Sequence, residues 1–299
     1  MNIIWRLLGY IASSQNNYAF IWAVHNGNLP LVKFLSTLPG IDVAARNNQA
    51  IIRASIDGDL EMVKYLSTLP GVDVSARNND AIIWAAHFGH LEVVQYLSTL
   101  PGVDASAQNN GAIIMAAHIN NLEIFKYLLT LPGVDATARN NLPLIEAVKE
   151  GHMSMVQYIL TLPGADITAA NNAAIIAAAS NNRIQMFEYL LTLPKIDVSA
   201  QNNAALFYAN EHLPIVAMLL YFEPKVAASL RGKRYIKYRN KLLSPLRIVT
   251  HKIAVSLTDL PTPILIEIIE QAVDFAIYIP YHIKWNMVVA IKHNKHIKK

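Results

Sequence analysis

A pair of adjacent asparagines returns in this sequence every 31 residues, and this interval constrains the fold more than any other feature. The pairs begin at Asn16, Asn47, Asn78, Asn109, Asn140, Asn171 and Asn202. The loop that ends on the pair also recurs almost unchanged, as LPGVDVSARNN, LPGVDASAQNN and LPGVDATARNN. A fixed period of roughly 20–50 residues is typical of stacked repeats, in which each unit buries its apolar face only against its neighbours. The sequence therefore predicts a stack of about six to seven units.

One unit, Asn78–Gln108, contains two segments with the character of helices. The first, AIIWAAH, is short and rich in alanine, and Gly89 follows it as a breaker. The second, LEVVQYLSTL, carries its apolar residues on one helical face, and Pro101 cannot continue it. Each unit is therefore predicted to be helix, turn, helix and loop. The fold class that follows is all-α, an elongated stack of helix pairs.

Short polar residues at fixed places mark where these segments begin and where the loops turn. Asn28, Asp59 and Asn121 precede second helices, where their side chains are predicted to cap the helix N-terminus. One aspartate recurs in every loop with the same 31-residue interval and is predicted to cap the loop. These aspartates are Asp42, Asp73, Asp104, Asp135, Asp166 and Asp197. We expect the asparagine pair to adopt left-handed backbone angles, which asparagine tolerates, after a shortened turn.

The segment AAHFGHLEVVQYL, Ala85–Leu97, resembles the ankyrin repeat, and the resemblance covers Gln15 to Tyr221. The family's Thr-Pro-Leu-His opening is replaced by Asp80-Ala81-Ile82-Ile83, and the unit is 31 residues long rather than about 33. The resemblance implies an ankyrin-repeat solenoid that binds proteins. The style of the repeats is also similar to ankyrin arrays of giant viruses and of Legionella-like intracellular bacteria. That similarity implies a secreted effector that binds a host protein in the host cytosol.

Charge divides the chain near residue 223. Residues 1–222 carry a net charge of −5 and residues 223–299 a net charge of +9, which together give the formal +4 of the chain. We expect a capping helix over 1–14, repeats over 15–222 and a basic helical domain over 223–299 that closes the stack. The apolar N-terminal run is too short to span a bilayer, so no transmembrane segment is predicted. The absence of cysteine excludes disulfides and thiolate metal sites.

Positions that vary between units are free to specialise, whereas constant positions serve the stack. Alanine is constant at one place in each first helix, at Ala23, Ala54, Ala85, Ala116, Ala147 and Ala178. The places next to it vary and share one helix face. We call their residues the variable stripe and predict that they bind a protein partner, because aromatic and arginine side chains often dominate interfaces. The predicted contact residues are Trp22, His25, Arg53, Trp84, His87, Phe88, Met115, His118, Glu146 and Lys149. The alternative is that some of them pack between neighbouring repeats.

The sequence predicts neither a metal nor a catalytic site. Three histidines, His25, His87 and His118, occupy the same repeat position. Zinc needs three or four ligands within about 2 Å of the ion. We expect these histidines to be about a helix diameter apart, with no Glu or Asp at ligand spacing. The chain contains no HExxH, GxSxG, phosphate-binding or dinucleotide-binding motif, so no cofactor and no enzymatic activity are predicted.

The region after residue 223 offers two other functions. The stretch Arg231–Lys252 contains eight Lys/Arg and no acidic residue, which favours nucleic acid, anionic lipid or an acidic partner, or nuclear targeting. The residues of this basic strip are Arg231, Lys233, Arg234, Lys237, Arg239 and Lys241. The alternative is a solvated basic helix packed on the last repeat.

The segment Leu257–Val273 resembles the opening of an F-box, in the arrangement that PRANC host-range proteins show after ankyrin repeats. The resemblance implies that Leu260, Pro261, Leu265 and Ile268 contact an adaptor of a host cullin ubiquitin ligase. The physical alternative is a helical cap, because Asp-Leu-Pro is a common helix start.

Overall fold

The computed structural model of the chain describes Tyr10, residues 17–209, His212, Ile215 and Leu219. The chain separates into two compact units, Met1–Ala170 and Asn171–Lys299. The predicted capping helix over 1–14, apart from Tyr10, and the predicted domain over 223–299 lie outside the described residues.

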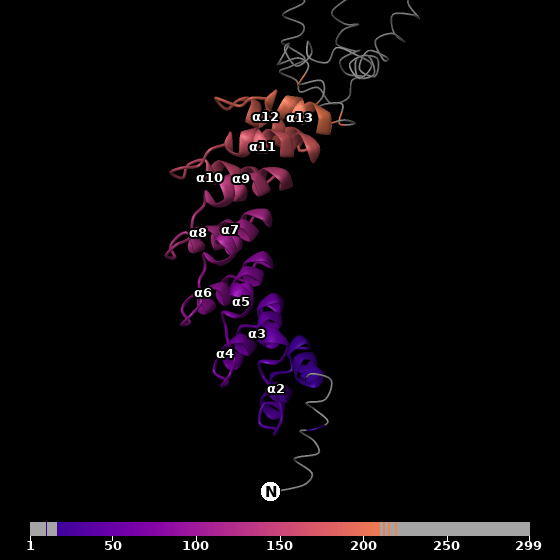
Figure 1. The fold of residues 1–299 in the computed structure, drawn as a ribbon, viewed down its shortest axis with the longest axis vertical. Coiled ribbons are helices and arrows are strands. Elements are labelled where there is room, and N and C mark those ends of the chain that lie inside the picture. Colours follow the sequence, from indigo (N-terminus) through magenta and orange to yellow (C-terminus); the bar gives the residue numbers. More distant parts are fainter. Residues whose placement is uncertain (1–9, 11–16, 210–211, 213–214, 216–218, 220–299) are drawn as a thin grey trace, which may run out of the picture. The chain divides into compact units, whose positions relative to one another are not determined.

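The first unit consists of helix pairs joined by short turns and loops (Figure 1). Residues 17–25 are helical, and the helices that follow are α2 (Leu29–Leu35), α3 (Ala45–Asp57), α4 (Leu60–Ser67), α5 (Ala76–His87), α6 (Leu91–Ser98), α7 (Ala107–His118), α8 (Leu122–Leu128), α9 (Ala138–Glu150) and α10 (Met153–Ile159). Helix α5 packs between α3 and α7, and α7 packs between α5 and α9. In a second row α6 lies between α4 and α8. The prediction of an all-α stack of helix pairs is confirmed over the described residues.

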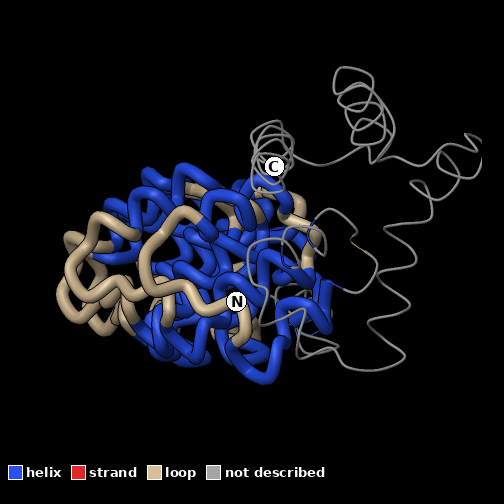
Figure 2. The backbone as a smooth tube through the Cα atoms, turned by 90° about the horizontal axis from the view of Figure 1, so that it is seen from above, coloured by secondary structure: helices blue, strands red, loops and turns tan. Residues whose placement is uncertain are grey.

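The second unit continues the pattern with α11 (Ala169–Ser180), α12 (Ile184–Leu191) and α13 (Ala200–Ala209). The boundary between the two units falls in the first turn of α11. Figure 2 shows helices and connecting loops, and no strand, among the described residues.

The constant alanines lie on the buried side of the first helices. Ala54, Ala85, Ala116 and Ala147 are completely buried. Alanine has only a methyl group, so the first helices of neighbouring repeats pack at short range. The second helices bury larger side chains, such as Leu97 of α6, against them. This burial agrees with the role in stacking that their constancy predicts.

The second asparagine of each pair ties the loop that it ends to the next loop along the array. Asn79 Oδ1 accepts a hydrogen bond from the backbone N–H of Asp104 at 2.9 Å, although the two residues are 25 apart in sequence. In five further loops the backbone N–H of the next loop aspartate donates the same bond, at 2.7–3.0 Å, to Asn17, Asn48, Asn110, Asn141 and Asn172. Asn79 is 6% exposed, so the bond is shielded from water. We call this bond the Asn–Asp latch.

The loop aspartate turns the chain with its own side chain. Asp104 Oδ1 accepts from the backbone N–H of Ser106 at 2.8 Å and from its hydroxyl at 2.7 Å. The predicted loop-capping role of these aspartates is therefore confirmed. The predicted N-caps are confirmed as well: Asp59 Oδ1, for example, accepts from the N–H of Met62 at 3.0 Å.

Left-handed backbone angles extend one residue further than the sequence predicted. Not only Asn78 and Asn79 but also Arg77, with φ of 53°, lies in this region. The same three-residue pattern recurs in α3, α7 and α9, where Arg46, Gln108 and Arg139 precede the pair. Three such residues reverse the chain inside each nominal first helix, so the regular helix starts after the second asparagine. The extra residue was missed because Arg and Gln have no special preference for this conformation.

A ladder of hydroxyl groups connects the second helices. Tyr96 Oη lies 2.9 Å from Ser67 Oγ, and Tyr127 Oη lies 2.7 Å from Ser98 Oγ. In the next repeat Leu129 replaces the serine, and the Tyr158 ring instead packs edge-on against Phe125. The ladder is therefore present only where the serine is.

Candidate interaction surface

The variable stripe opens with an ion-pair cluster between the first two repeats. His25 Nδ1 lies 3.4 Å from Asp57 Oδ2, and Arg53 Nε donates to the same oxygen at 3.0 Å. Trp22, one turn before His25, is half exposed. Sequence reasoning named His25 and Arg53 but missed Asp57. The signal that identifies Asp57 is its place four residues after Arg53, on the same helix face.

Aromatic rings gather at the end of α5. Trp84, His87 and Phe88 contact one another, with ring centroids 5.5 Å apart for Trp84 and His87 and 4.9 Å apart for His87 and Phe88. Phe88 is 50% exposed and Trp84 is 38% exposed. The structure therefore brings together three residues that the sequence placed on one helix face, and it leaves two large apolar side chains in contact with solvent.

The cluster continues into the next repeat through two stacked imidazoles. The rings of His87 and His118 lie 5.9 Å apart and are inclined by only 22°. His87 Nδ1 is shielded from solvent and has no hydrogen-bond partner. Burial, together with the neighbouring His118, lowers the pKa of His87 below its ordinary value. His87 therefore favours its neutral form at the centre of the stripe.

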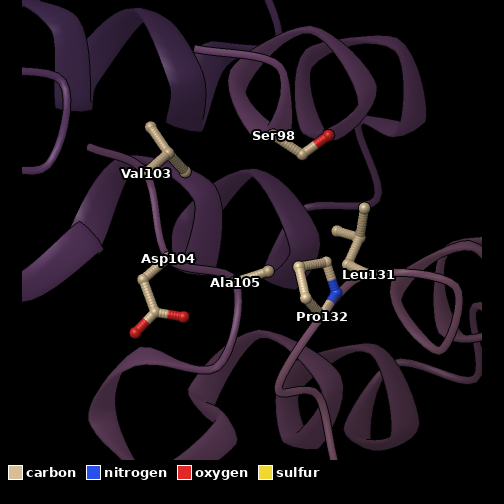
Figure 3. A pocket seen from close by; sticks show the side chains of 6 residues that line it. All are labelled: Ser98, Val103, Asp104, Ala105, Leu131 and Pro132. Atoms are coloured by element: carbon tan, nitrogen blue, oxygen red, sulfur yellow. The ribbon is translucent and has the colours of Figure 1, made fainter. Parts of the chain in front are cut away.

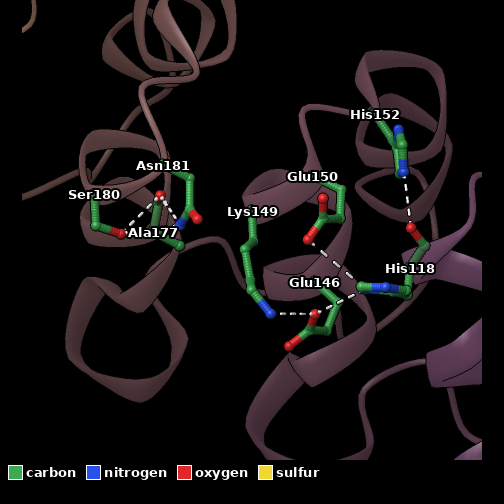
Figure 4. Close-up of polar contacts among 8 residues, drawn as sticks. All are labelled: His118, Glu146, Lys149, Glu150, His152, Ala177, Ser180 and Asn181. Atoms are coloured by element: carbon green, nitrogen blue, oxygen red, sulfur yellow. Dashed lines mark hydrogen bonds and ion pairs between the residues drawn. The ribbon is translucent and has the colours of Figure 1, made fainter. Parts of the chain in front are cut away.

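His118 in turn faces two carboxylates of α9 (Figure 4). His118 Nδ1 lies 3.2 Å from Glu146 Oε2 and 3.9 Å from Glu150 Oε1. Lys149 Nζ donates to Glu146 Oε2 at 3.1 Å. Glu150 lies four residues after Glu146 and therefore on the same helix face of the variable stripe.

These contacts form an uninterrupted chain from α5 through α7 to α9. We call it the stripe centre: Trp84, His87, Phe88, His118, Glu146, Lys149 and Glu150. Met115 also belongs to the predicted stripe, and its side chain is half-buried. At the end of α11 the equivalent positions are small or polar: Asn181 Nδ2 donates to the Ala177 carbonyl at 2.9 Å and lies 3.0 Å from Ser180 Oγ.

Two parts of the argument against a metal site are wrong. His87 and His118 are not a helix diameter apart, because their rings stack. Carboxylates also accompany a histidine at ligand spacing, since donor atoms of His118, Glu146 and Glu150 lie within 4.8 Å of one another. The sequence argument failed because it compared positions within one repeat, whereas these donors come from successive repeats.

A second histidine position, not recognised in the sequence, joins neighbouring repeats. His152 Nε2 donates to the backbone carbonyl of His118 at 2.8 Å, and His90 Nε2 donates to the carbonyl of Ile56 at 2.9 Å. Both histidines stand directly before a second helix. Each bond satisfies a carbonyl at the end of the first helix of the preceding repeat.

One pocket lies among the loops that follow α6 and α8 (Figure 3). Its volume is about 140 Å³, and it is lined by Ser98, Val103, Asp104, Ala105, Leu131 and Pro132. All six occupy loop or loop-adjacent positions of the repeat, and loops of the same kind return along the array. We interpret the pocket as a consequence of stacking similar loops.

Comparison with known protein families decides the identity of the fold. A family model described as "Ankyrin repeats (3 copies)" matches residues 20–109, 82–171 and 144–228, which together span more than half of the 299 residues. The chain belongs to the ankyrin-repeat family. A search of curated proteins found no match. Ankyrin repeats are general protein–protein interaction modules and typically act as non-catalytic scaffolds.

Other predicted features of this ankyrin-repeat protein lie beyond the described part of the chain. The basic strip from Arg231 to Lys241 and the F-box-like residues Leu260, Pro261, Leu265 and Ile268 fall outside the described residues. Of the helices that the structure describes, none has both the length and the apolar character needed to cross a bilayer.

Proposed function

We propose that this ankyrin-repeat chain binds a protein partner through the variable stripe, with the stripe centre as its main contact. The observation that carries the proposal is the continuous set of side-chain contacts from Trp84 to Lys149 across three repeats. These residues occupy positions that vary along the array, whereas the latch and the alanines beside them repeat.

The chemistry of the stripe centre supports a protein ligand. Trp84 and Phe88 expose apolar surface, and the carboxylates of Glu146 and Glu150 follow on the same stripe, beyond His87 and His118. Clusters of exposed aromatic side chains with a charged border are typical of interface hot spots. The complementary partner surface would combine an apolar residue with a Lys or Arg that pairs with the carboxylates.

The test is to identify a partner by capture with the intact chain and then to measure its affinity for purified variants. The double variant Trp84→Ala/Phe88→Ala should weaken binding, as should Trp84→Ala/Arg53→Ala. The matched control is Phe34→Ala, which removes an exposed aromatic ring of α2 outside the stripe. Equal affinity for the stripe variants and the control would refute the proposed surface.

The partner that we propose is a host protein, met in the host cytosol after secretion of this chain as an effector. The support is the similarity of the repeat style to arrays of giant viruses and intracellular bacteria. A translocation reporter fused to the chain tests this idea in infected cells. Retention of the reporter inside the producing cell would reject the effector role.

Two sequence features after residue 223 support alternative functions. Leu260 and Pro261 favour an adaptor for a cullin ubiquitin ligase, so that capture should recover cullin components and Leu260→Ala/Pro261→Ala should abolish the recovery. The basic strip favours nucleic acid or anionic membranes, whose binding should fall steeply with salt. Absence of any binding at low salt would exclude this second alternative.

A further inference from the structure

We propose that His118, Glu146 and Glu150 form a binding site for one divalent transition-metal ion of zinc's class. The three residues come from two successive repeats, His118 from the end of α7 and both glutamates from the last turns of α9. The proposal does not depend on the protein-binding function.

The distances suit a single ion. Nitrogen and oxygen ligands bind zinc at about 2.0–2.2 Å, so two ligands of a tetrahedral ion lie about 3.3–3.6 Å apart. His118 Nδ1 lies 3.2 Å from Glu146 Oε2 and 3.9 Å from Glu150 Oε1. The donor atoms of all three lie within 4.8 Å of one another. Side-chain movements of about 1 Å would place them around one ion.

The donor set selects a class of metal. One imidazole nitrogen and two carboxylate oxygens suit zinc and its neighbours in the first transition series better than calcium or magnesium, which prefer oxygen ligands alone. Three protein ligands leave a tetrahedral ion one further position, for water or for a side chain of a bound protein. The two carboxylates also supply the negative charge that a divalent cation requires.

The same chain has an equivalent junction with which this site can be compared. The equivalent junction between the first two repeats has a histidine, His25, and a carboxylate, Asp57, which corresponds to Glu150. At the place of Glu146, however, it has Arg53, whose Nε donates to Asp57 at 3.0 Å. There the arginine neutralises the single carboxylate, which makes an ion pair. The His118 junction has a second carboxylate in place of that cation.

The surroundings hold His118 in place. The ring of His87 covers it by stacking, and the hydrogen bond from His152 fixes its backbone carbonyl. Metal-binding histidines commonly rely on such supporting contacts. Lys149, 3.1 Å from Glu146, is a cation that a metal ion must displace.

The experiment is a zinc titration of the intact purified chain by calorimetry, with cobalt(II) absorption as a second readout of the ligand environment. The wild-type chain should bind one zinc ion more than the Glu146→Gln/Glu150→Gln variant. Mutation of a residue that only supports a metal ligand lowers the metal affinity about 10–100-fold. Loss of two ligands should therefore weaken zinc binding by at least about 100-fold. Glutamine has nearly the shape of glutamate, and circular dichroism checks that the variant remains helical.

The matched control is His25→Ala, which removes the histidine of the ion-pair junction and should leave zinc binding unchanged. The ten histidines of the chain give other places for zinc, and the difference between wild type and variants removes their contribution. Lys149→Met should tighten binding, because it removes the competing cation. Equal stoichiometry and affinity in wild type and the Glu146→Gln/Glu150→Gln variant, or weaker binding by Lys149→Met, would overturn the site.

Discussion

Polar side chains serve two different purposes on the same repeats, in the loops and on the variable stripe. In the loops, the bond that the N–H of Asp104 donates to the buried Asn79 is short, and the same bond recurs along the array. On the stripe, the contacts of His118 are partly exposed and differ from one junction to the next. The loop bonds join backbone to side chain, whereas the stripe contacts join side chains only.

This difference indicates which residues of the array stabilise the fold and which residues can be exchanged with little loss of stability. A buried side chain that satisfies a backbone N–H is costly to remove, because the N–H is left without a partner. A half-exposed ion pair contributes little to stability, so its residues can be exchanged. We therefore expect changes in the latch to affect folding and changes on the stripe to affect binding.

The largest expected effect is that of Asn79→Ala. The substitution leaves the N–H of Asp104 unsatisfied and places alanine at a φ of 68°. An unsatisfied buried group costs about 1–3 kcal/mol, and a left-handed alanine costs about 1 kcal/mol more. The free energy of unfolding in urea should fall by about 2–4 kcal/mol.

The companion variant Asn79→Gly separates the two causes. Glycine accepts the left-handed angles, so only the hydrogen bond is lost, at about 1–3 kcal/mol. If both variants were as stable as wild type, the latch would not hold the stack.

The next effect, slightly smaller than that of Asn79→Ala, is expected when Gly58→Ala and Gly71→Ala are compared with each other. Both glycines have positive φ, 73° and 88°, so both variants lose about 1–2 kcal/mol from backbone strain. A methyl group at Gly58 would also collide with the imidazole of His90, whereas nothing lies within 4 Å of one at Gly71. Thermal unfolding should show Gly58→Ala as the less stable variant by about 1 kcal/mol or more. If Gly71→Ala were instead the less stable variant, the His90 side chain would move away from the new methyl group without a loss of free energy.

The hydroxyl ladder should contribute less. Tyr96→Phe removes one hydroxyl group 2.9 Å from Ser67, and Ser67→Ala removes the other. A double-mutant cycle on urea unfolding should give a coupling energy of about 0.5–1.5 kcal/mol. The matched control is Tyr158→Phe, because the preceding repeat has Leu129 in place of the serine that would pair with Tyr158. Additive effects of the two substitutions would mean that the ladder carries no stability.

The smallest effect concerns pH and His87, on the stripe. Its pKa is lower in the folded chain than in the unfolded chain, where it is about 6.5. The unfolded state therefore binds a proton first as the pH falls, so the fold loses stability below about pH 6.5 until the folded pKa is passed. His87→Gln should show a weaker dependence of unfolding on pH between about 7 and 5. An identical dependence in both proteins would contradict the role of His87.

The repeat period was enough to predict the helix pairs, the caps and the stack, because these depend on local propensity and on the apolar pattern of each unit. Asp59 and the constant Ala85 could be assigned from their own segment alone. The latch could not, since Asn79 acts on Asp104 in the following loop. Its Asn-Asn signal was visible, but only the structure shows which partner the second asparagine reaches.

The stripe was predicted from its variability, and its members Trp84, His87 and Phe88 do meet. The pairing of His118 with Glu146 and Glu150 was missed, because it requires the offset between one repeat and the next. Residues 28 and 32 apart in sequence become neighbours only once the stacking register is known. A search for such pairs at one repeat length, plus or minus a few residues, would have found it.

The most direct test of the account compares Trp84→Ala/Phe88→Ala with Asn79→Gly in two measurements, affinity for the captured partner and the free energy of unfolding. We predict that the stripe variant loses at least about 30-fold in affinity, as expected for hot spots worth about 2 kcal/mol, and keeps its stability. Asn79→Gly should lose stability but, where it is still folded, bind with the wild-type affinity. A stripe variant with unchanged affinity, or one that unfolds as readily as Asn79→Gly, would contradict the division between a constant stack and a variable binding surface.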